Sequence, residues 1–391
     1  MKIGVACDFN PYEFKDYFSG GEVPDTHDTP SSTQALVKSF LDDGHTVYVF
    51  ALNPTNERIE LLSDRLKVFL IPYRLMPRTN VFQIYKIKQL RNTIRKELKN
   101  IDVLHAHWTY EYAYATKVFA KEIPVFCTVR DWCPFIMSLP MPLFGKIVWR
   151  FIKYRMFRSV MTDGNIHLIA NSHYTRSCIK NEYPNIDVPI IPNSIKKDLI
   201  LSERKVKAKN VTIVTIANGI TSPRKNVYNL LKAFKMLHAQ HDEAELLLLG
   251  KCETDNPVYL RWQQEGLLDG VKTLGKKSHE EMVEVLDTAT IMVHPSLEET
   301  FGNTLIEAMA RRIPVIGGEK SGAVPAVLGN GRYGLCCDVT NPTEIFNSIN
   351  YLLDDENANK IIEAATIYLK STFASEVVCR SHIELYSKYL S

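Results

Sequence analysis

The order of short apolar runs and longer amphipathic segments constrains the fold of this 391-residue chain more than any other feature. The pattern occurs twice. The first series has apolar runs at 2–7, 45–50, 66–71, 101–107 and 123–129, and helical patterns at 35–41, 81–98 and 112–120. The second has runs at 211–218, 244–250, 271–275, 291–296, 313–318 and 333–338, and helical patterns at 226–239, 280–286 and 303–310. Since strand–helix alternation indicates a parallel sheet wrapped by helices, we predict an α/β chain of two doubly wound, Rossmann-like domains facing a central cleft.

The boundary between the two domains is predicted from a charged segment at 202–210. We expect one domain at 1–195, a second at 196–372, and a last helix at 373–391 that can pack back on the first domain. The length agrees with two or three domains. In open sheets of this kind ligands bind at the carboxyl ends of the strands, so the cleft is the predicted ligand site.

Charge is divided unevenly between the halves. Residues 1–195 carry 24 Lys and Arg against 19 Asp and Glu, and residues 196–391 carry 23 against 25. Two stretches of the first half, 66–99 and 139–161, are basic and amphipathic, which predicts peripheral contact with an anionic membrane surface. A solvated helix face that packs on the domain explains the periodicity equally well. We expect no nucleic-acid partner, because no nucleic-acid-binding motif accompanies the charge.

Targeting signals and cysteine spacing point to the cytoplasm. Asp8 interrupts the only apolar run near the start, and no run of about 18 apolar residues occurs. The eight cysteines show no C-x-x-C spacing and are interpreted as reduced thiols. We therefore expect a cytoplasmic protein that can associate with the inner face of the cell membrane.

The most informative segment is PSLEETFGNTLIEAMARRIPVIG at 295–317. It leads from the end of a predicted strand through an acidic loop into a helix that Thr300 or Asn303 can cap. Glu299 and Glu307 could hold two ends of one elongated ligand, although acids near a helix start are also favoured for electrostatic reasons alone. The free amides of the first turn suit a phosphate group, and they belong to Phe301, Gly302, Asn303 and Thr304.

This segment is similar to the nucleotide-sugar site of the family 4 glycosyltransferases, retaining enzymes of the GT-B fold with two glutamates in the same spacing. The second half also resembles the family in TIANGITSPRKNVYNLLKAF, ELLLLGKC and SGAVPAVLGNGRYGLCCD, and the first half does so more weakly in DVLHAHW and PVFCTVRDW. The resemblance, of the bacterial surface-polysaccharide or lipopolysaccharide type, implies transfer of a sugar from a UDP- or GDP-sugar. The implied acceptor is a hydroxyl of a glycan or lipid-linked glycan.

The resemblance implies a role for each matching residue in the second half. Glu307 would bind the ribose hydroxyls, Glu299 the hydroxyls of the donor sugar, and Lys225 the leaving diphosphate. The family usually has an arginine six residues before that lysine, and here the position is Gly219. Arg224 could replace the missing arginine or could be an exposed charge.

In the first half, family members often carry Thr-x-His-Asp after a buried strand. This chain has Thr128, Val129, Arg130 and Asp131, so that a guanidinium replaces the imidazole. We name Arg130 and Asp131 as candidate catalytic residues, with Arg130 contacting an acidic donor sugar or a phosphate. A local ion pair between the two is the alternative. Relatives also place a Gly-Gly pair near the diphosphate, and Gly20 and Gly21 are the candidates. They lie further from the following helix than in the usual pattern, so an insertion is the alternative interpretation, and Ser31 and Ser32 are alternative donors at the helix start.

We expect transfer without a metal ion and without a cofactor other than the nucleotide sugar. The chain has no Asp-x-Asp, and the pair His105 and His107 has no further Cys, His or acidic residues at metal-ligand spacing. A sugar-nucleotide epimerase of the same fold and a non-enzymatic two-lobed sugar-binding protein are the alternative functions. The absence of G-x-G-x-x-G after the first strand argues against a nicotinamide dehydrogenase.

Overall fold

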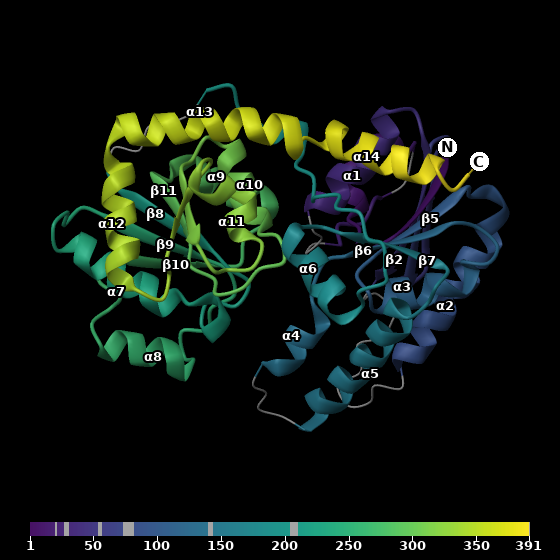
Figure 1. Cartoon of the computed structure of the whole chain (residues 1–391), viewed down its shortest axis with the longest axis horizontal. Coiled ribbons are helices and arrows are strands. Elements are labelled where there is room, and N and C mark those ends of the chain that lie inside the picture. Colours follow the sequence, from purple (N-terminus) through teal and green to yellow (C-terminus); the bar gives the residue numbers. More distant parts are fainter. Residues whose placement is uncertain are drawn as a thin grey trace. The chain divides into compact units, whose positions relative to one another are not determined.

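The computed structural model of the chain describes residues 1–19, 22–26, 31–53, 57–72, 82–139, 144–203 and 210–390, without the side chains of 82–84 and 144–149. Gly20, Gly21 and most of the predicted linker lie outside these residues. The chain forms two compact units (Figure 1). Unit 1 comprises Met1–Ser194 and Ser375–Ser391, and unit 2 comprises Ile195–Ala374.

Unit 1 is built on a sheet whose described strands lie in the order β3-β4-β2-β1-β5-β6-β7. All neighbours are parallel except β3, which pairs antiparallel with β4 at one edge. Apart from the edge strand β3, the strands are largely buried apolar runs, as expected for a sheet covered on both faces. Their bounds are β1 Lys2–Ala6, β2 Thr46–Asn53, β3 Ile59–Leu62, β4 Leu66–Pro72, β5 Val103–His107, β6 Val125–Val129 and β7 Ile166–Ala170.

Helices cover both faces of the unit 1 sheet, and each face has its own hydrophobic core. The last helix of the chain, α14, belongs to this unit: it packs beside α1, and Tyr386 of α14 is fully buried (Figure 1). The helices are α1 Ser31–Asp42, α2 Phe82–Glu97, α3 Glu111–Thr116, α4 Cys133–Ser138, α5 Phe144–Met161, α6 His173–Glu182 and α14 Ser375–Ser387.

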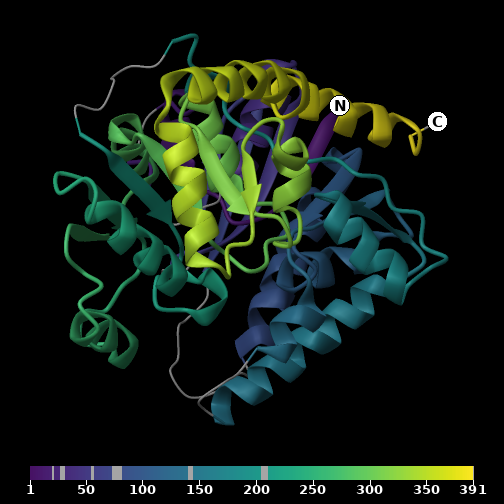
Figure 2. The same cartoon turned by 60° about the vertical axis from the view of Figure 1, so that its left-hand side comes forward.

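Unit 2 contains a second parallel sheet, in the order β10-β9-β8-β11-β12-β13. Hydrophobic cores again lie on both faces, and Figure 2 shows the sheet with helices on either side. The strands are β8 Thr212–Ile216, β9 Glu245–Leu249, β10 Val271–Gly275, β11 Ile291–His294, β12 Val315–Gly318 and β13 Leu335–Cys337.

The helices of unit 2 follow from amphipathic patterns with recognisable starts. Helix α7 buries Leu230, Phe234 and Leu237 on one stripe, and α12 begins with Pro342 behind an Asn341 side-chain cap. The helices are α7 Val227–His238, α8 Pro257–Gln264, α9 His279–Thr288, α10 Asn303–Ala310, α11 Val324–Val327, α12 Pro342–Leu353 and α13 Asp355–Thr372.

The strand order places a topological switch point in each sheet. In unit 2 the chain runs outward from β8 through β9 to β10, and then returns to the other side of β8 to build β11, β12 and β13. In sheets of this kind the ligand crevice lies at the carboxyl ends of the two strands from which the connections run in opposite directions, here β8 and β11. In unit 1 the corresponding point lies between β1 and β5.

The two Rossmann-like domains predicted from the sequence are confirmed, but several elements were missed. The edge strands β3 and β7 have no strong alternation, and the short helices α4, α6, α8 and α11 have too few turns to show a clear period. The antiparallel pairing of β3 is also a departure from the predicted all-parallel sheet.

Candidate active site

The loops after β8 and β11 are fastened to each other at the switch point of unit 2. The Leu297 amide donates to the Arg224 carbonyl at 2.9 Å. The Asn226 side chain donates to the carbonyls of Pro295 and Val339, at 3.1 and 2.7 Å. Asn226 is buried and has a left-handed backbone (φ 53°), which Asn tolerates better than most residues. The buried amide therefore fixes the residue before it, Lys225, against the β11 loop.

Lys225 and Glu299 form a close ion pair across this junction. Lys225 Nζ lies 2.5 Å from Glu299 Oε1, although the residues are 74 positions apart in the chain. Lys225 is 8% exposed, and the Glu299 side chain is 15% exposed. His294 Nε2, from the last residue of β11, lies 3.4 Å from the same carboxylate oxygen. An ammonium carries three donor hydrogens, so Lys225 can bind a second anion while it keeps Glu299.

The surroundings of Glu299 keep its carboxylate ionised. Burial alone raises the pKa of a carboxyl group, but the His294 imidazole and the Lys225 ammonium outweigh burial and hold the pKa of Glu299 well below its usual range. The carboxylate is therefore an acceptor of hydrogen bonds at neutral pH. Such a group suits the hydroxyls of a sugar.

Arg224 also reaches this loop. Its guanidinium donates to the Glu298 carbonyl at 3.0 Å and lies 3.4 Å from Glu298 Oε2 and 3.9 Å from Glu299 Oε2. Adjacent residues would diverge on a strand or helix, but Arg224 and Lys225 lie in a 3-10 turn, Pro223–Lys225, and both face the β11 loop. Gly219 begins this loop with a φ of 87°, and its carbonyl accepts from the Ser222 amide. The structure thus places the Arg224 guanidinium beside Glu298 and Glu299. Gly219, at the position where the family usually has an arginine, has no side chain to reach them.

Glu307 lies inside α10 and is 5% exposed. Its Oε1 is 3.2 Å from Nε2 of His279, the first residue of α9. A reciprocal capping box between Ser278 and Glu281 fixes that helix start, so the imidazole is presented from a rigid position. Each of the two glutamates predicted as donor ligands therefore has a histidine beside it.

The first turn of α10 begins differently from the prediction. Its cap is Gly302, which has φ 91°, and not Thr300 or Asn303; no side chain of the described residues caps the helix. The left-handed backbone explains the choice of residue, because only glycine adopts it readily. Phe301 is 3% exposed and packs edge-on against Phe373, so its side chain serves the core. The Thr304 hydroxyl lies 3.4 Å from His294 Nδ1.

A second glycine holds the backbone of Glu299. The Glu299 carbonyl accepts a hydrogen bond from the Ala323 amide at 2.8 Å, next to a bridge between Glu299 and Gly322. A Cβ atom at Gly322 would lie 2.4 Å from the Glu299 carbonyl oxygen, and the glycine has φ 65°. The close approach therefore requires glycine at this position.

Arg130 and Asp131 lie in unit 1, after the carboxyl end of β6. The Arg130 guanidinium donates to His107 Nδ1, Ser32 Oγ and Asn193 Oδ1 at 3.0, 2.9 and 2.8 Å. Burial lowers the pKa of Arg130 to about 10, so the group remains charged at neutral pH. Burial, together with the charge of the nearby Asp131, raises the pKa of Tyr110. Ser32, in the first turn of α1, is thus one ligand of the guanidinium.

His105 and His107 belong to a buried polar network. His105 Nδ1 faces the Tyr386 hydroxyl at 2.7 Å, and its Nε2 faces the Thr128 hydroxyl at 2.8 Å. The His382 ring of α14 packs against His105 at a tilt of 48°, with ring centroids 5.1 Å apart. Both nitrogens of His105 are therefore used within the protein. Within the described ranges no group of three or more His, Cys, Asp or Glu residues has the arrangement of a metal site.

Three side chains at this junction were not singled out from the sequence: His279, His294 and Glu298. His294 stands directly before Pro295 at the end of a buried strand, and that position is the only local signal it gives. His279 is 28 residues from its partner Glu307, so sequence spacing could not pair them.

Both halves of the chain match family models of known proteins. Residues 31–199 match the family model Glycosyltransferase Family 4, and residues 201–367 match Glycosyl transferases group 1. The two matches together include Arg224, Lys225, Glu299 and Glu307 of unit 2, together with Arg130 and Asp131 of unit 1.

Two curated relatives and one solved structure illustrate the similarity. The N-acetyl-alpha-D-glucosaminyl L-malate synthase of Bacillus anthracis is 25% identical over 301 residues, 74% of this chain and 75% of the relative. The lipopolysaccharide 1,2-N-acetylglucosaminetransferase of Salmonella typhimurium is 26% identical over 243 residues, 58% of this chain and 63% of the relative. Anabaena Alr3699/HepE, solved in complex with UDP-glucose, superposes with a TM-score of 0.67 at 17% identity, covering 99% of this chain and 100% of that one.

Proposed function

The chain belongs to the family 4 glycosyltransferases of the GT-B fold, and from this premise we propose that it transfers a sugar, with retention of configuration, from a UDP- or GDP-sugar to a glycan or lipid-linked glycan. One observation carries the proposal. The Lys225–Glu299 ion pair lies at the switch point of unit 2, where this fold binds ligands, next to a helix start without a side-chain cap. The curated relatives named above act in N-acetylglucosaminyl transfer by their names, and the Anabaena structure contains UDP-glucose.

In this proposal the donor lies along the crevice with one carboxylate for each sugar. Glu307 binds the ribose hydroxyls, and His279 orients its carboxylate. Glu299 binds the hydroxyls of the transferred sugar and is held by Lys225, His294 and the Gly322–Ala323 backbone. A carboxylate can accept from both hydroxyls of a vicinal diol, and each charge-assisted hydrogen bond contributes about 1.5–3 kcal/mol.

The leaving diphosphate is stabilised by positive charge from the protein. Lys225 is the main cation, Arg224 is the second, and the first-turn amides of Asn303 and Thr304 supply donors at the positive end of the α10 dipole. We propose that these groups act without a metal ion. Fixed charges of this kind cost little reorganisation when the leaving-group charge develops.

The chemical step in this proposal needs no enzyme nucleophile. The bond between the anomeric carbon and the diphosphate oxygen breaks as the acceptor oxygen bonds to the same face of that carbon. The acceptor proton passes to the departing phosphate oxygen. Glu299 orients the sugar, and its low pKa keeps it an acceptor throughout. Arg130, which the network of unit 1 holds, contacts the donor phosphate or an acidic sugar in this proposal, and Asp131 follows it in the same loop.

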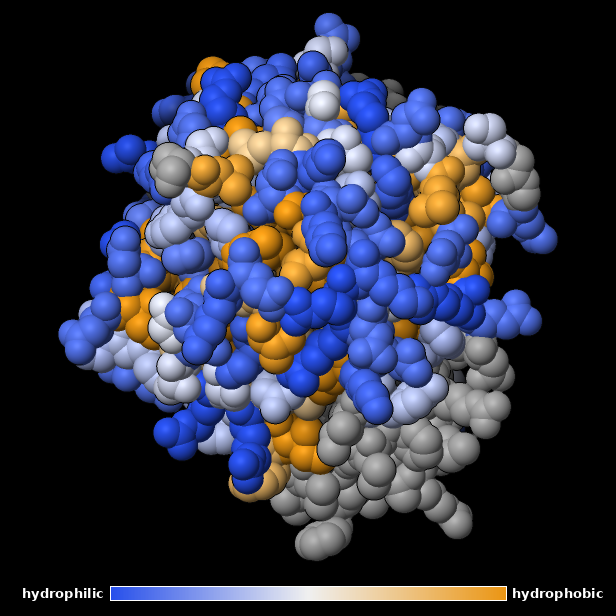
Figure 3. Space-filling model, turned by 90° about the vertical axis from the view of Figure 1, so that its right-hand side faces the viewer, coloured by the Kyte–Doolittle hydropathy of each residue, from blue (hydrophilic) through white to orange (hydrophobic). Residues whose placement is uncertain are grey.

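Helix α5 supports the further proposal of peripheral membrane contact, from the part of 139–161 that the structure describes. Phe151, Arg155 and Arg158 are exposed on one side of the helix, and Phe151 is 59% exposed. Other cations of the two basic stretches bind within their own unit: Lys86 and Lys153 pair with Glu111, and Arg91 donates to the Tyr114 carbonyl. No helix in the described ranges is both long and apolar enough to cross a bilayer. The face drawn in Figure 3 is mostly hydrophilic, with separate hydrophobic patches. The membrane proposal therefore depends on Phe151, Arg155 and Arg158 of α5.

Flotation with anionic liposomes tests the membrane proposal. We expect the wild type to float with vesicles that contain phosphatidylglycerol at low salt and to be released at high salt, because each cation near the headgroups contributes about 1 kcal/mol. Replacing Arg155 and Arg158 with Glu should abolish flotation. A wild type that stays with the soluble fraction at low salt would remove the proposal.

Calorimetric binding of UDP, GDP and ADP, in the presence of EDTA, tests the donor site. We expect one nucleotide to bind the wild type saturably and binding to be weaker by at least tenfold in Glu307→Gln. The matched control is Glu284→Gln, which changes an exposed glutamate on α9. If all three nucleotides fail to bind, or if both variants bind like the wild type, the donor-site assignment is wrong. Product stereochemistry by NMR then tests retention.

A further inference from the structure

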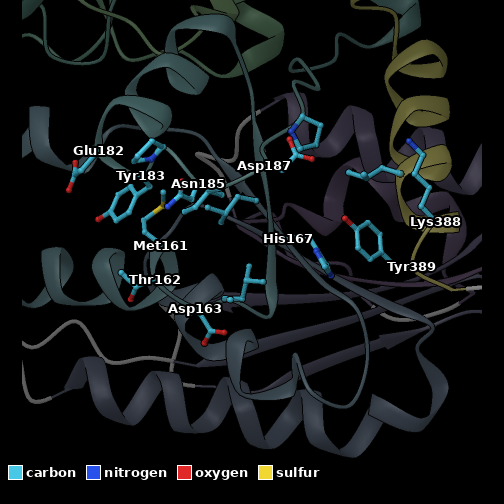
Figure 4. A pocket seen from close by; sticks show the side chains of 17 residues that line it. Met161, Thr162, Asp163, His167, Glu182, Tyr183, Asn185, Asp187, Lys388 and Tyr389 are labelled. Carbon is cyan, nitrogen blue, oxygen red and sulfur yellow. The ribbon is translucent and has the colours of Figure 1, made fainter.

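A groove in unit 1 lies away from the residues assigned above. It has a volume of about 720 Å³, within the range of small-molecule sites. Four parts of the unit border it: the turn after α5, the strand β7, the loop after α6 and the end of α14. Figure 4 shows Glu182 and Tyr183 on one side and His167, Tyr389 and Lys388 on the other.

The floor of the groove is the edge strand β7 of the sheet. β7 is the last strand, and Ala170 pairs outward with the next chain segment through the Pro189 carbonyl and the Ile191 amide, at 2.9 and 3.0 Å. Because backbone groups two residues apart point to the same side of a strand, the N–H and C=O of Leu168 also point outward. Leu168 lines the groove, with 3% of the residue exposed.

The walls combine aromatic rings with carboxylates. Tyr389 packs on His167 with ring centroids 3.8 Å apart, which fixes one wall. On the opposite wall, burial and the neighbouring Glu182 raise the pKa of Tyr183 to about 12, so its hydroxyl is a donor at neutral pH. Asp163 is held by Lys117 at 3.1 Å, whereas Glu182 and Asp187 are exposed.

The groove carries a net negative charge, which disfavours anions. Three carboxylates line it, from Asp163, Glu182 and Asp187, against the ammonium of Lys388 and that of Lys117, which pairs with Asp163. Phosphate, nucleic acid and anionic lipid would meet net repulsion here. A neutral molecule with many hydroxyl groups fits each feature: its hydroxyls donate to the carboxylates, its C–H faces pack on the tyrosine rings, and the Leu168 backbone completes the hydrogen bonds.

We propose that this groove binds an uncharged oligosaccharide, as a subsite for a part of the glycan acceptor remote from the reacting hydroxyl. The location supports a remote subsite, since the groove borders the amino half of β7 and Arg130 follows the carboxyl end of β6. The four steps from Ile166 to Ala170 alone span about 13 Å, longer than one sugar ring. The assignment to an acceptor rests on the proposed function, whereas oligosaccharide binding by the groove does not.

The test is binding of neutral hexasaccharides, maltohexaose and chitohexaose, to the full chain by saturation-transfer NMR and calorimetry. We expect at least one to bind saturably. Tyr183→Ala and Asp187→Asn should each weaken binding by about tenfold, and Tyr183→Phe should retain most of it because the ring remains. Tyr351→Ala, which removes an exposed tyrosine from α12 in unit 2, is the matched control and should bind like the wild type.

Two results would overturn the groove proposal. One is that neither hexasaccharide binds, or that Tyr183→Ala and Asp187→Asn bind as well as the control. The other is that hexagalacturonate, an anionic hexasaccharide, binds as tightly as the neutral ones. Glu307→Gln separates the two proposals: it should lose the nucleotide and keep the oligosaccharide. A chain that binds hexasaccharide but no nucleotide would contradict the donor site alone.

Discussion

The roles proposed for single residues of unit 2 follow from the charges of their side chains and from the contacts that these side chains make. Lys225 has a carboxylate on one side and two donor hydrogens for a second anion, and Glu299 is kept ionised by its neighbours. Glu307 is buried beside His279 and lies inside α10, the helix that follows the Glu299 loop. These contacts give each candidate residue an effect that can be measured separately.

Removing the Lys225 ammonium should affect chemistry more than binding. In Lys225→Met we expect kcat to fall by about 10² to 10³, as for other preorganised donors at a developing charge, with a smaller change in KM. Glu299 loses its cation, so its pKa should rise and the acid limb of the kcat profile should move to higher pH. Lys235→Met, on the exposed side of α7, is the control. An unchanged kcat and pH profile in Lys225→Met would contradict the assigned role.

At the scale of elements, two close approaches hold the sites in place. Gly322, in the loop before α11, lets the backbone come close to Glu299. In unit 1, α14 returns to the sheet and places Tyr386 and His382 against β5. The first approach requires the missing Cβ of Gly322, and the second requires the side chains of Tyr386 and His382. Substitution at these positions should therefore lower the free energy of unfolding.

Gly322→Ala should weaken donor binding by about tenfold and lower stability by about 1–3 kcal/mol, because a Cβ would lie 2.4 Å from the Glu299 carbonyl oxygen in a backbone of φ 65°. Gly331→Ala is the matched control: its φ is 96°, but no atom lies within 4 Å of the added Cβ. The control has the backbone strain without the clash, so it should keep donor affinity. Calorimetry and urea unfolding measure both effects, and equal donor affinity in the two variants would exclude the clash as a cause.

Tyr386→Phe should destabilise unit 1 by about 1–3 kcal/mol, since it leaves a buried nitrogen of His105 without its partner at 2.7 Å. Tyr389→Phe, three residues later on a 44% exposed ring, should change stability by less than about 0.5 kcal/mol. Hydrogen exchange of the β5 amides reports this unit specifically. Equal protection in the two variants would show that the hydroxyl contributes nothing.

At the scale of the whole molecule, buried histidines make the stability of unit 1 sensitive to acid. Unit 1 buries His105, His107 and His382 fully, and burial with the nearby positive charge of Arg130 lowers the pKa of all three; for His382 the value is about 3. These imidazoles stay neutral in the folded protein, whereas in the unfolded chain they take up protons below pH about 6.5. The unfolded state then binds more protons, so the stability of unit 1 should fall as pH drops below 6.5.

The loss from His382 alone should reach about 2 kcal/mol at pH 5 relative to pH 7. We expect β5 amide protection to fall over this range, and to fall less steeply in His382→Gln, which removes one of the titrating groups. His173→Gln, an exposed histidine of the same unit, is the control and should behave like the wild type. A protection factor that is independent of pH between 7 and 5 would contradict the burial of neutral imidazoles.

The sequence by itself determined the class of fold, the family and the segment at 295–317, because these depend on local patterns: apolar runs of strand length, helical periods and the spacing of Glu299 and Glu307. It did not show that the helix after Glu299 starts at a glycine cap, since a left-handed backbone leaves no mark except the glycine itself. Only the tertiary structure decided that Lys225 meets Glu299 across 74 residues, that His279 meets Glu307, and that α14 completes unit 1 through a contact of residues 281 positions apart. Such pairings are set by the order in which parallel strands pack and by the loops that follow adjacent strands, and spacing along the chain does not encode that order.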